Sequence, residues 1–251
     1  YWNFKSDLNA QIRSGCIHCE GSRLYMAKVW RYEESAAQSL VDIIHQPALQ
    51  PIPLPEVLQV NDITLCEEQR NAVEMALRFR LSLILGGAGS GKSTLIQAIV
   101  NALGDENTTV LCAPTGKAAR NLTSRTGLPA RTVHSALGLH VNEDFLAPVR
   151  WETVDLVIVD EASMLTLEMM AGILHRVPAS CRVVLLGDPN QLLSVGAGNV
   201  LPDLVELGAP CYRLFSNHRQ ANAPSSLLHN VVNFHNLQSC CDLRYDENFR
   251  L

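Results

Sequence analysis

Long apolar runs are missing from this sequence, although 47% of its 251 residues are hydrophobic. A transmembrane helix needs about 18 or more consecutive apolar residues, so we expect no membrane span. The opening stretch, YWNFKSDLNAQ, has neither an initiating methionine nor the apolar core of a signal peptide. We therefore expect a cytoplasmic chain that comes from the middle of a longer protein and forms one large or two small domains.

A second pair of cysteines close to the first one is also missing. Cys16 and Cys19 form one CxxC pair, Cys240 and Cys241 lie far away in sequence, and the remaining cysteines are scattered. Zinc sites are typically built from two such pairs or from histidines at fixed spacing, so a single pair gives zinc little support. We expect ordinary reduced thiols, as in a cytosol.

Positive charge is scarce overall, because the formal net charge is −5. This balance argues against a generally basic nucleic-acid-binding protein. Acidic residues, however, are absent from residues 107–142, where the basic side chains are Lys117, Arg120, Arg125 and Arg131. Such a stretch is compatible with a focused polyanion site and equally with an ordinary solvated surface.

A phosphate-binding loop is the strongest feature that is present. The apolar run at residues 81–85 leads into GGAGSGKST, which completes the pattern G-x-x-x-x-G-K-[ST]. Glycines let consecutive N–H groups turn toward a phosphate, and a helix beginning at Lys92 directs its positive end to the same place. We expect Lys92 to reach the β- and γ-phosphates of ATP, and Ser93 to ligate Mg²⁺. The predicted nucleotide-binding residues of this loop are Gly87, Ala88, Gly89, Ser90, Gly91, Lys92, Ser93 and Thr94.

Two adjacent carboxylates follow a second apolar run. Residues 154–159, VDLVIV, are interrupted only by Asp155 and lead directly into Asp160 and Glu161. A pair of carboxylates at the end of a buried strand is costly unless a cation offsets it. The arrangement predicts that Asp160 holds Mg²⁺ and that Glu161 orients or deprotonates the attacking water.

Strands and helices alternate along the chain. Short apolar runs that end in polar clusters occur at residues 81–85, 109–113, 154–159, 183–186 and 212–215. This pattern predicts an α/β fold with a doubly wound parallel sheet, helices on both faces and a site along one edge.

We expect four parts in the chain: a small mixed unit, a proline-rich segment, the ATPase domain and a final linker. The small unit is expected to hold a strand or a short hairpin arm at residues 22–30 and a helix at residues 32–45. Four prolines between Pro47 and Pro55 favour extended chain, either a linker or a wrapping segment. The predicted boundaries are residues 1–46, 47–61, 62–225 and 226–251.

A helix is expected just before the phosphate loop. Thr64 and Glu67 match a capping box that opens this helix, and Gln69 lies in its first turn. The amide of Gln69 offers both a donor and an acceptor to an adenine edge. The same residue is equally compatible with an ordinary solvated helical position.

Six motifs occur in a fixed order along the chain: GGAGSGKST, APTGKAA, TVH, VDEAS, GDPNQL and NHRQ. This series resembles the superfamily-1 helicases. The stretch GDPNQLLSVGAGNVLPDL resembles their RecD-like branch, which contains the alpha subunit of exodeoxyribonuclease V and its stand-alone relatives. The resemblance covers residues 60–225 and implies a P-loop NTPase with a RecA-like motor domain that acts on single-stranded DNA in recombination or repair.

The resemblance also implies roles for single residues. Gln69 would contact adenine, Gln191 would sense the γ-phosphate and connect it to the DNA groove, and Arg219 would reach the γ-phosphate. The expected catalytic residues are Lys92, Asp160, Glu161, Gln191 and Arg219. The residues implied to contact single-stranded DNA are Pro114, Thr115, Lys117, Thr132 and His134.

Superfamily-1 helicases carry later motifs on a second motor domain, and nothing after Arg219 resembles them. We therefore expect this chain to bind ATP and Mg²⁺, to hydrolyse ATP poorly and not to unwind DNA by itself. The resemblance implies RecB- or RecC-like subunits as partners, and we expect the isolated chain to be monomeric. Two alternatives stay open: a nucleotide-binding docking module of a helicase–nuclease, and the motor of an RNA helicase or a conjugative relaxase.

Overall fold

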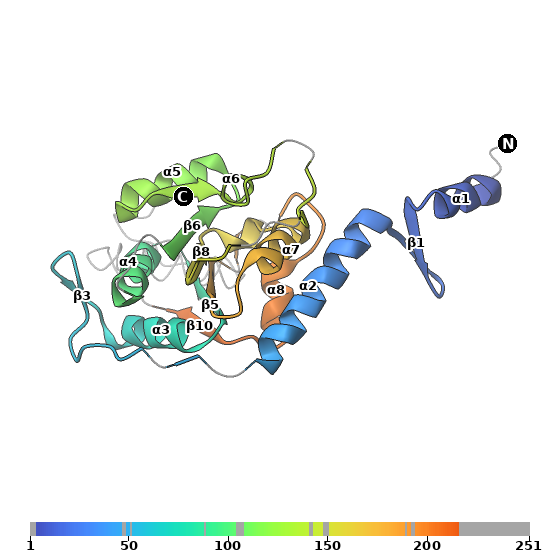
Figure 1. The fold of residues 1–251 in the computed structure, drawn as a ribbon. Coiled ribbons are helices and arrows are strands. Elements are labelled where there is room, and N and C mark those ends of the chain that lie inside the picture. The colour runs from blue at the N-terminus through green and yellow to red at the C-terminus, as the bar shows by residue number, and fades with distance from the viewer. Residues whose placement is uncertain are drawn as a thin grey trace, which may run out of the picture.

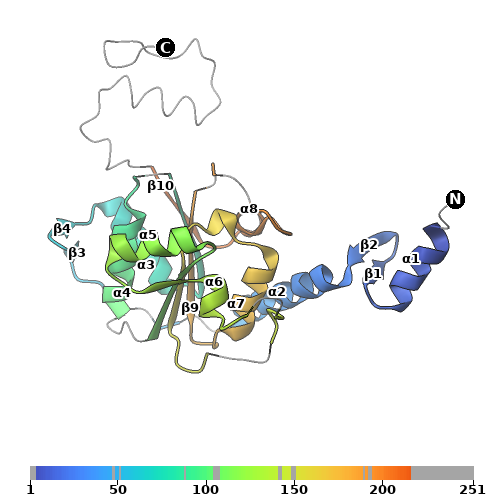
Figure 2. The same cartoon turned by 90° about the horizontal axis from the view of Figure 1, so that it is seen from above.

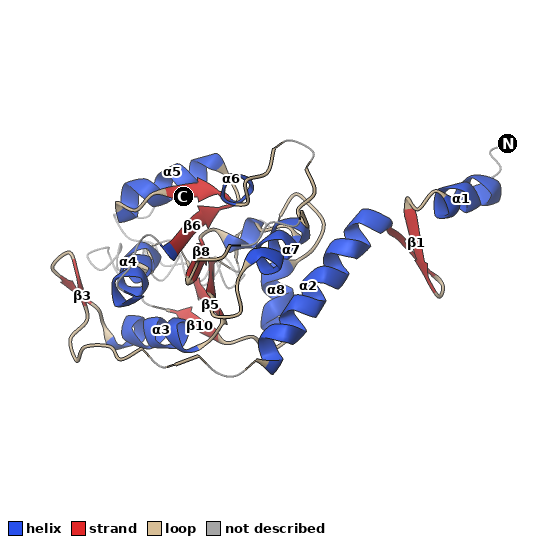
Figure 3. Cartoon of the chain, in the orientation of Figure 1, coloured by secondary structure: helices blue, strands red, loops and turns tan. Residues whose placement is uncertain are grey.

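One six-stranded parallel sheet forms the centre of the protein (Figures 1 and 3). The computed structural model describes residues 4–46, 49–50, 52–87, 89–103, 108–140, 143–147, 151–188, 190–191 and 194–215. The strand order is β10-β5-β9-β8-β6-β7, and every neighbouring pair is parallel. The six strands are β5 (Leu81–Gly86), β6 (Thr109–Ala113), β7 (Ala130–Thr132), β8 (Leu156–Val159), β9 (Arg182–Gly187) and β10 (Cys211–Leu214).

Helices cover both faces of this sheet, which confirms the predicted α/β fold (Figure 2). One face is covered by α3 (Glu67–Arg78), α4 (Lys92–Leu103) and α5 (Gly116–Thr126). The other face is covered by α2 (Ala27–His45), α6 (Val133–Ala136), α7 (Leu167–Arg176), α8 (Val200–Glu206) and the 3₁₀ turn η2 (Ala162–Met164). Within β5, Leu83 and Leu85 pack on the α7 side, whereas Ile84 packs on the α3 side, as the alternation of a strand requires.

The central strands are apolar along their whole length because helices bury both of their faces. Every residue of β5 and of β9 is buried. This pattern is typical of parallel sheets. The three-residue edge strand β7 is only partly buried, and the apolar runs in the sequence do not predict it.

The leading region projects away from the sheet, as Figures 1 and 2 both show. It consists of α1 (Phe4–Arg13), the antiparallel hairpin β1 (Ile17–Glu20) and β2 (Arg23–Met26), and the first turns of α2. The strand expected at residues 22–30 stops at Met26, and the helix begins at Ala27 instead of residue 32. The first buried side chains of α2 are Tyr32 and Ala36, and none of residues 27–31 is buried, so the first turn of the helix has no buried apolar face that the sequence pattern could reveal. No described helix is both long and apolar enough to cross a bilayer.

The proline-rich segment lies along the sheet domain. Arg182 donates a hydrogen bond to the carbonyl of Gln50 (3.2 Å), and Arg70 donates to the carbonyl of Glu56 (2.9 Å). Leu58 is buried in the core on the α3 side. A small hairpin, β3 (Gln59–Val60) and β4 (Ile63–Thr64), follows. Of the two alternatives for this segment, the described part follows the wrapping one, while the four-part division of the chain stays a prediction.

The capping box of α3 lies two residues after the predicted one. Thr64 belongs to β4, so it is not available as a cap, and the helix begins at Glu67 with Cys66 as its N-cap. The Gln69 side chain supplies the reciprocal contact, since its Oε1 accepts a hydrogen bond from the Cys66 N–H at 3.2 Å. The prediction of a capping box at Thr64 and Glu67 was therefore wrong, although the predicted helix is present.

Candidate nucleotide site and neighbouring loops

The phosphate loop connects β5 to α4, as the motif requires. Gly89 and Gly91 have φ angles of 88° and 85°, in the left-handed region that glycine adopts without strain. The hydroxyl of Ser90 donates to the carbonyl of Gly87 at 2.9 Å and closes the turn. The described residues of the loop therefore form a turn that depends on these glycines and on Ser90.

Lys92 begins α4 and lies at the positive end of that helix. Its Nζ donates hydrogen bonds to the carbonyls of Gly86 and Gly87, the latter at 3.0 Å. These contacts keep the ammonium group over the loop, where a bound phosphate would meet it.

Asp160 and Glu161 follow β8 at the same edge of the sheet. Asp160 is 8% exposed, and its carboxylate accepts a hydrogen bond from the Glu161 N–H at 2.9 Å. Burial raises the pKa of Asp160 above its ordinary value, and the negative charge of Glu161 adds to the rise, while Lys92 and Arg125 oppose it. Glu161 itself has φ 54°, in the left-handed region, and its Oε2 is buried without a hydrogen-bond partner in the described part of the chain.

One cavity of about 440 Å³ brings these groups together. Its lining consists of Gly87, Gly89, Ser90, Gly91, Lys92, Ser93, Thr94, Arg125, Asp160, Glu161 and Gln191. Gln191 follows β9, which lies between β5 and β8 in the sheet, so the strand order explains why it lies beside both the loop and the carboxylates. The hydroxyl of Ser93 and the buried carboxylate of Asp160 are the hard oxygen ligands that suit Mg²⁺.

Arg125 is a cavity residue that the sequence reasoning did not assign to the site. It lies in the last turn of α5, more than 30 residues from the phosphate loop in sequence. The contact of α5 with α4 brings it there, including a 2.6 Å hydrogen bond from Gln97 to the carbonyl of Thr126. The only signal in the sequence was its place in the stretch without acidic residues.

Three residues predicted for the nucleotide site are not among the described residues that line the cavity. Ala88 and Arg219 lie outside the described residues. Gln69 is 4% exposed and does not line the cavity, and its Oε1 is already used by the N-cap of α3. Its contact with adenine therefore stays a prediction, for which its amide N–H groups and the second lone pair of Oε1 remain.

The residues expected to contact DNA lie where β6 and β7 end, along the same sheet edge. Thr115 and Thr132 are the N-caps of α5 and α6, and each hydroxyl oxygen accepts a backbone N–H at 3.2 Å. A hydroxyl that accepts can still donate its own hydrogen, so both remain able to contact a phosphate. Lys117 and His134 are exposed, whereas Pro114 is buried.

The cysteines of the leading hairpin are exposed free thiols, and Cys240 and Cys241 lie outside the described residues. Within the part of the chain that the structure describes, no three His, Cys, Asp or Glu side chains are grouped to hold a metal ion. Burial raises the pKa of the Cys112 and Cys181 thiols to about 12, so these two are neutral core residues.

Comparison with known proteins gives a consistent result. Residues 64–234 match the family described as AAA domain. The chain is 41% identical over 161 residues to the ATP-dependent RecD2 DNA helicase of Deinococcus radiodurans, covering 62% of this chain and 22% of that protein. It is 34% identical over 215 residues to the RecBCD enzyme subunit RecD of Mycolicibacterium smegmatis, covering 74% of this chain and 38% of that protein.

A solved structure shows the same fold. The crystal structure of Pif1 helicase from Candida albicans superposes with a TM-score of 0.54 at 23% identity, covering 69% of this chain and 44% of that one. At this identity the similarity concerns the fold alone. The chain thus spans between about a fifth and two fifths of the length of the two curated relatives above.

Proposed function

We infer the function from one premise: the chain belongs to the AAA domain family, within the RecD-like branch of the superfamily-1 helicases. We propose that it binds ATP with Mg²⁺ at the loop between β5 and α4 and hydrolyses it. We further propose that this hydrolysis serves movement on single-stranded DNA in recombination or repair. The observation that carries the proposal is the single cavity that joins Lys92, Ser93, Asp160, Glu161 and Gln191.

The hydrolytic step follows from the placement of these side chains. Lys92 and the N–H groups of the loop bind the β- and γ-phosphates, where they offset the charge that spreads over the oxygens during transfer. Ser93 and Asp160 would hold Mg²⁺, and the positive charge of that ion would neutralise part of the developing negative charge.

Glu161 has the properties of the residue that holds the attacking water. Its unpartnered buried Oε2 is an acceptor without another role in the described residues. In the proposed step the water oxygen bonds to the γ-phosphorus, the bond to the bridging oxygen of ADP breaks, and Glu161 accepts the water proton. Gln191, from β9, would hold the same water or the γ-phosphate from the side of the DNA loops.

Arginine would supply further charge in the transition state. We propose that Arg219 reaches the γ-phosphate, as the family resemblance implies, and that Arg125 approaches the phosphates from α5. The position of Arg125 in the cavity lining supports its part of this proposal.

The proposed DNA contacts are mainly with phosphates. Lys117 contributes a charge, and the capping hydroxyls of Thr115 and Thr132 each keep a hydrogen to donate. Contacts of this kind do not depend on base sequence and weaken as salt rises. The name of the Mycolicibacterium relative, a RecBCD enzyme subunit, supports RecB- and RecC-like proteins as the partners we propose.

The test is ATP turnover by the 251-residue chain with and without a single-stranded oligonucleotide. We expect ATP turnover that rises when the oligonucleotide is added, and we expect Lys92→Ala to reduce it at least about 100-fold, as the loss of a transition-state contact does. We expect no strand separation, because translocation needs a second motor domain. Nucleotide binding without turnover in either condition would favour a docking role over a motor, and robust unwinding would contradict the proposed dependence on a second domain.

A further inference from the structure

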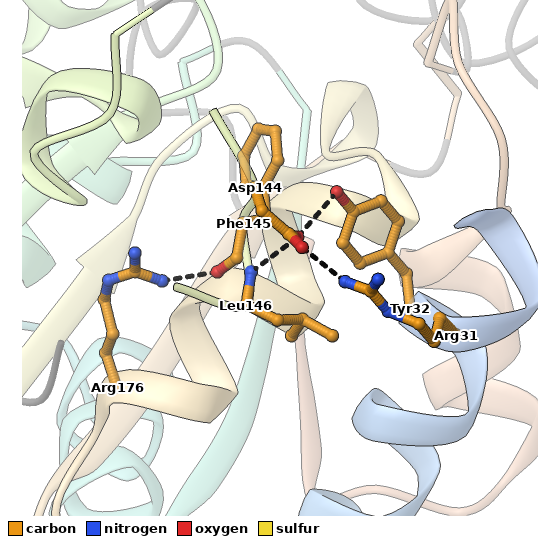
Figure 4. A network of polar contacts seen from close by, with 6 residues as sticks. All are labelled: Arg31, Tyr32, Asp144, Phe145, Leu146 and Arg176. Carbon is orange, nitrogen blue, oxygen red and sulfur yellow. Dashed lines mark hydrogen bonds and ion pairs between the residues drawn. The ribbon is translucent and has the colours of Figure 1, made fainter. Parts of the chain in front are cut away.

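A network of polar contacts ties α2 to the segment between α6 and β8 (Figure 4). Tyr32 donates its hydroxyl hydrogen to Asp144 Oδ1 at 3.1 Å, and the Leu146 N–H donates to the same oxygen at 3.1 Å. Arg31 forms an ion pair with Asp144 Oδ2. Both oxygens of Asp144 are therefore engaged, and two of the donors come from the leading helix.

Phe145, the next residue, is fixed by its backbone and by its ring. Its carbonyl accepts a hydrogen bond from Arg176, a fully buried side chain of α7 that also donates to the carbonyl of Gly172 at 3.2 Å. The Phe145 and Tyr32 rings form a T-shaped contact, with ring centres 6.0 Å apart. It packs directly on Gly172, where an added Cβ would lie 2.9 Å from the ring.

The other neighbour of Phe145 is His134, which is expected to contact DNA. The two ring centres lie 5.1 Å apart at an interplanar angle of 69°. His134 is exposed and lies on α6, a helix of only four residues that offers few contacts of its own. Phe145 is thus the packing surface that limits how the His134 ring can turn.

We propose that Arg31 and Tyr32 are positioning residues for the DNA edge: they hold Asp144, and Asp144 keeps Phe145 beneath the ring of His134. The inference rests on the proposed DNA contact of His134. The helix α2 then has a function in DNA binding, although none of its residues lines the nucleotide cavity.

Stability alone does not account for this network. The Arg31 and Asp144 side chains are 52% and 43% exposed, and ion pairs at such exposure contribute little to folding. What the contacts do is fix geometry, because three donors hold a single carboxylate in one orientation. A side chain that is held in its binding orientation before the ligand arrives avoids an entropy cost on binding.

The test uses the whole chain and compares two mild substitutions with a matched control. Tyr32→Phe removes only the hydroxyl, and Asp144→Asn removes the charge but keeps an acceptor for Leu146. The control is Asp42→Asn, which also removes an exposed, hydrogen-bonded carboxylate from this region, on α2, but has no contact with Phe145 in the hydrogen bonds described. For each variant, affinity for a labelled oligothymidine, affinity for MgADP and the NMR signal of the His134 ring are measured.

We expect Tyr32→Phe and Asp144→Asn to weaken oligothymidine binding about threefold to tenfold, a size typical of coupling between residues in contact. MgADP affinity should stay within about twofold of the parent chain, since the nucleotide cavity is not altered. The His134 ring signal should move in both variants and not in Asp42→Asn. Combining Asp144→Asn with His134→Ala should weaken binding no more than His134→Ala alone.

Two outcomes contradict the inference in different ways. If His134→Ala weakens oligothymidine binding and neither Tyr32→Phe nor Asp144→Asn does, the inference is wrong and the proposed function stands. If the parent chain does not bind oligothymidine at all, the proposed function fails and the inference fails with it. A lowered MgADP affinity in the Tyr32→Phe and Asp144→Asn variants shows a general loss of structure, which also overturns a specific positioning role.

Discussion

Arg125 lines the cavity beside the phosphate loop, although it lies on α5, whose N-cap Thr115 is expected to contact DNA. We predict that Arg125→Gln weakens MgATP binding about threefold to tenfold. The loss of a buried charge-assisted hydrogen bond would weaken binding more, but Arg125 is exposed. The matched control is Arg120→Gln, on the same helix and outside the cavity lining. Equal effects of the two substitutions in nucleotide titrations without DNA would mean that only net charge matters.

Asp160 is a buried carboxylate whose charge is costly in the absence of a cation. Burial raises the pKa of Asp160 in the folded chain, so the folded chain favours the protonated carboxyl group. This preference stabilises the fold fully at low pH, and the stabilisation is lost as pH rises through the raised pKa. We predict that Asp160→Asn raises the melting temperature of the nucleotide-free chain at neutral pH and abolishes Mg²⁺-dependent turnover. A melting curve at two pH values checks this, since the gain should shrink at acid pH. A lower melting temperature at neutral pH would contradict the prediction.

Single residues differ in how far the sequence defines them. Lys92 and Ser93 act within one continuous loop, so their spacing alone predicts their neighbours. Arg125 reaches the cavity only through the packing of α5 on α4, which no spacing encodes. Thr115 and Thr132 are a third case. The resemblance implies DNA contacts for both residues, but the sequence alone does not predict that their hydroxyls cap α5 and α6.

At the scale of elements, α7 packs closely on Phe145 and Leu137 through a glycine. Gly172 lies in its middle, where a Cβ would lie 2.9 Å from Phe145 and 3.0 Å from Leu137. Alanine would gain up to about 1 kcal/mol of helix propensity, but overpacking costs about 1–3 kcal/mol. We therefore predict that Gly172→Ala lowers the free energy of unfolding by about 1 kcal/mol in urea titrations.

The control for this prediction is Gly116→Ala at the start of α5. A Cβ there meets only Thr132, at the ordinary distance of 3.9 Å, so stability should be unchanged or slightly higher. Equal losses in both variants would show that the contact with Phe145 has no special cost.

Elements with a long apolar signal were predictable, and short ones were not. The runs that became β5, β6 and β9 are continuous because both faces are covered. β7 has three residues at the sheet edge, and the β3–β4 hairpin has two per strand, too few to show a period. The sequence predicts the start of α2 at residue 32 instead of Ala27, because the first turn of the helix has no apolar face toward the sheet.

At the scale of the whole molecule, nucleotide binding should stabilise the fold. A ligand at 100 times its dissociation constant adds about 2.7 kcal/mol, which for a chain of this size raises the melting temperature by about 5–10 °C. We predict such a rise with MgADP in the parent chain and none in Lys92→Ala. A thermal melt with and without nucleotide measures it, and a rise that persists in Lys92→Ala would place binding elsewhere.

The order of strands in the sheet has a consequence for the newly made chain. β5 pairs with β9 and β10, which come last among the described strands, and it does not pair with β6, the next one made. On the ribosome, the phosphate loop therefore emerges long before the two strands that hold it in place. Non-local pairing of this kind is slow, and unpaired strand edges attract one another until it is complete. We therefore expect both edges of β5 to stay unpaired during synthesis until β9 and β10 have been made.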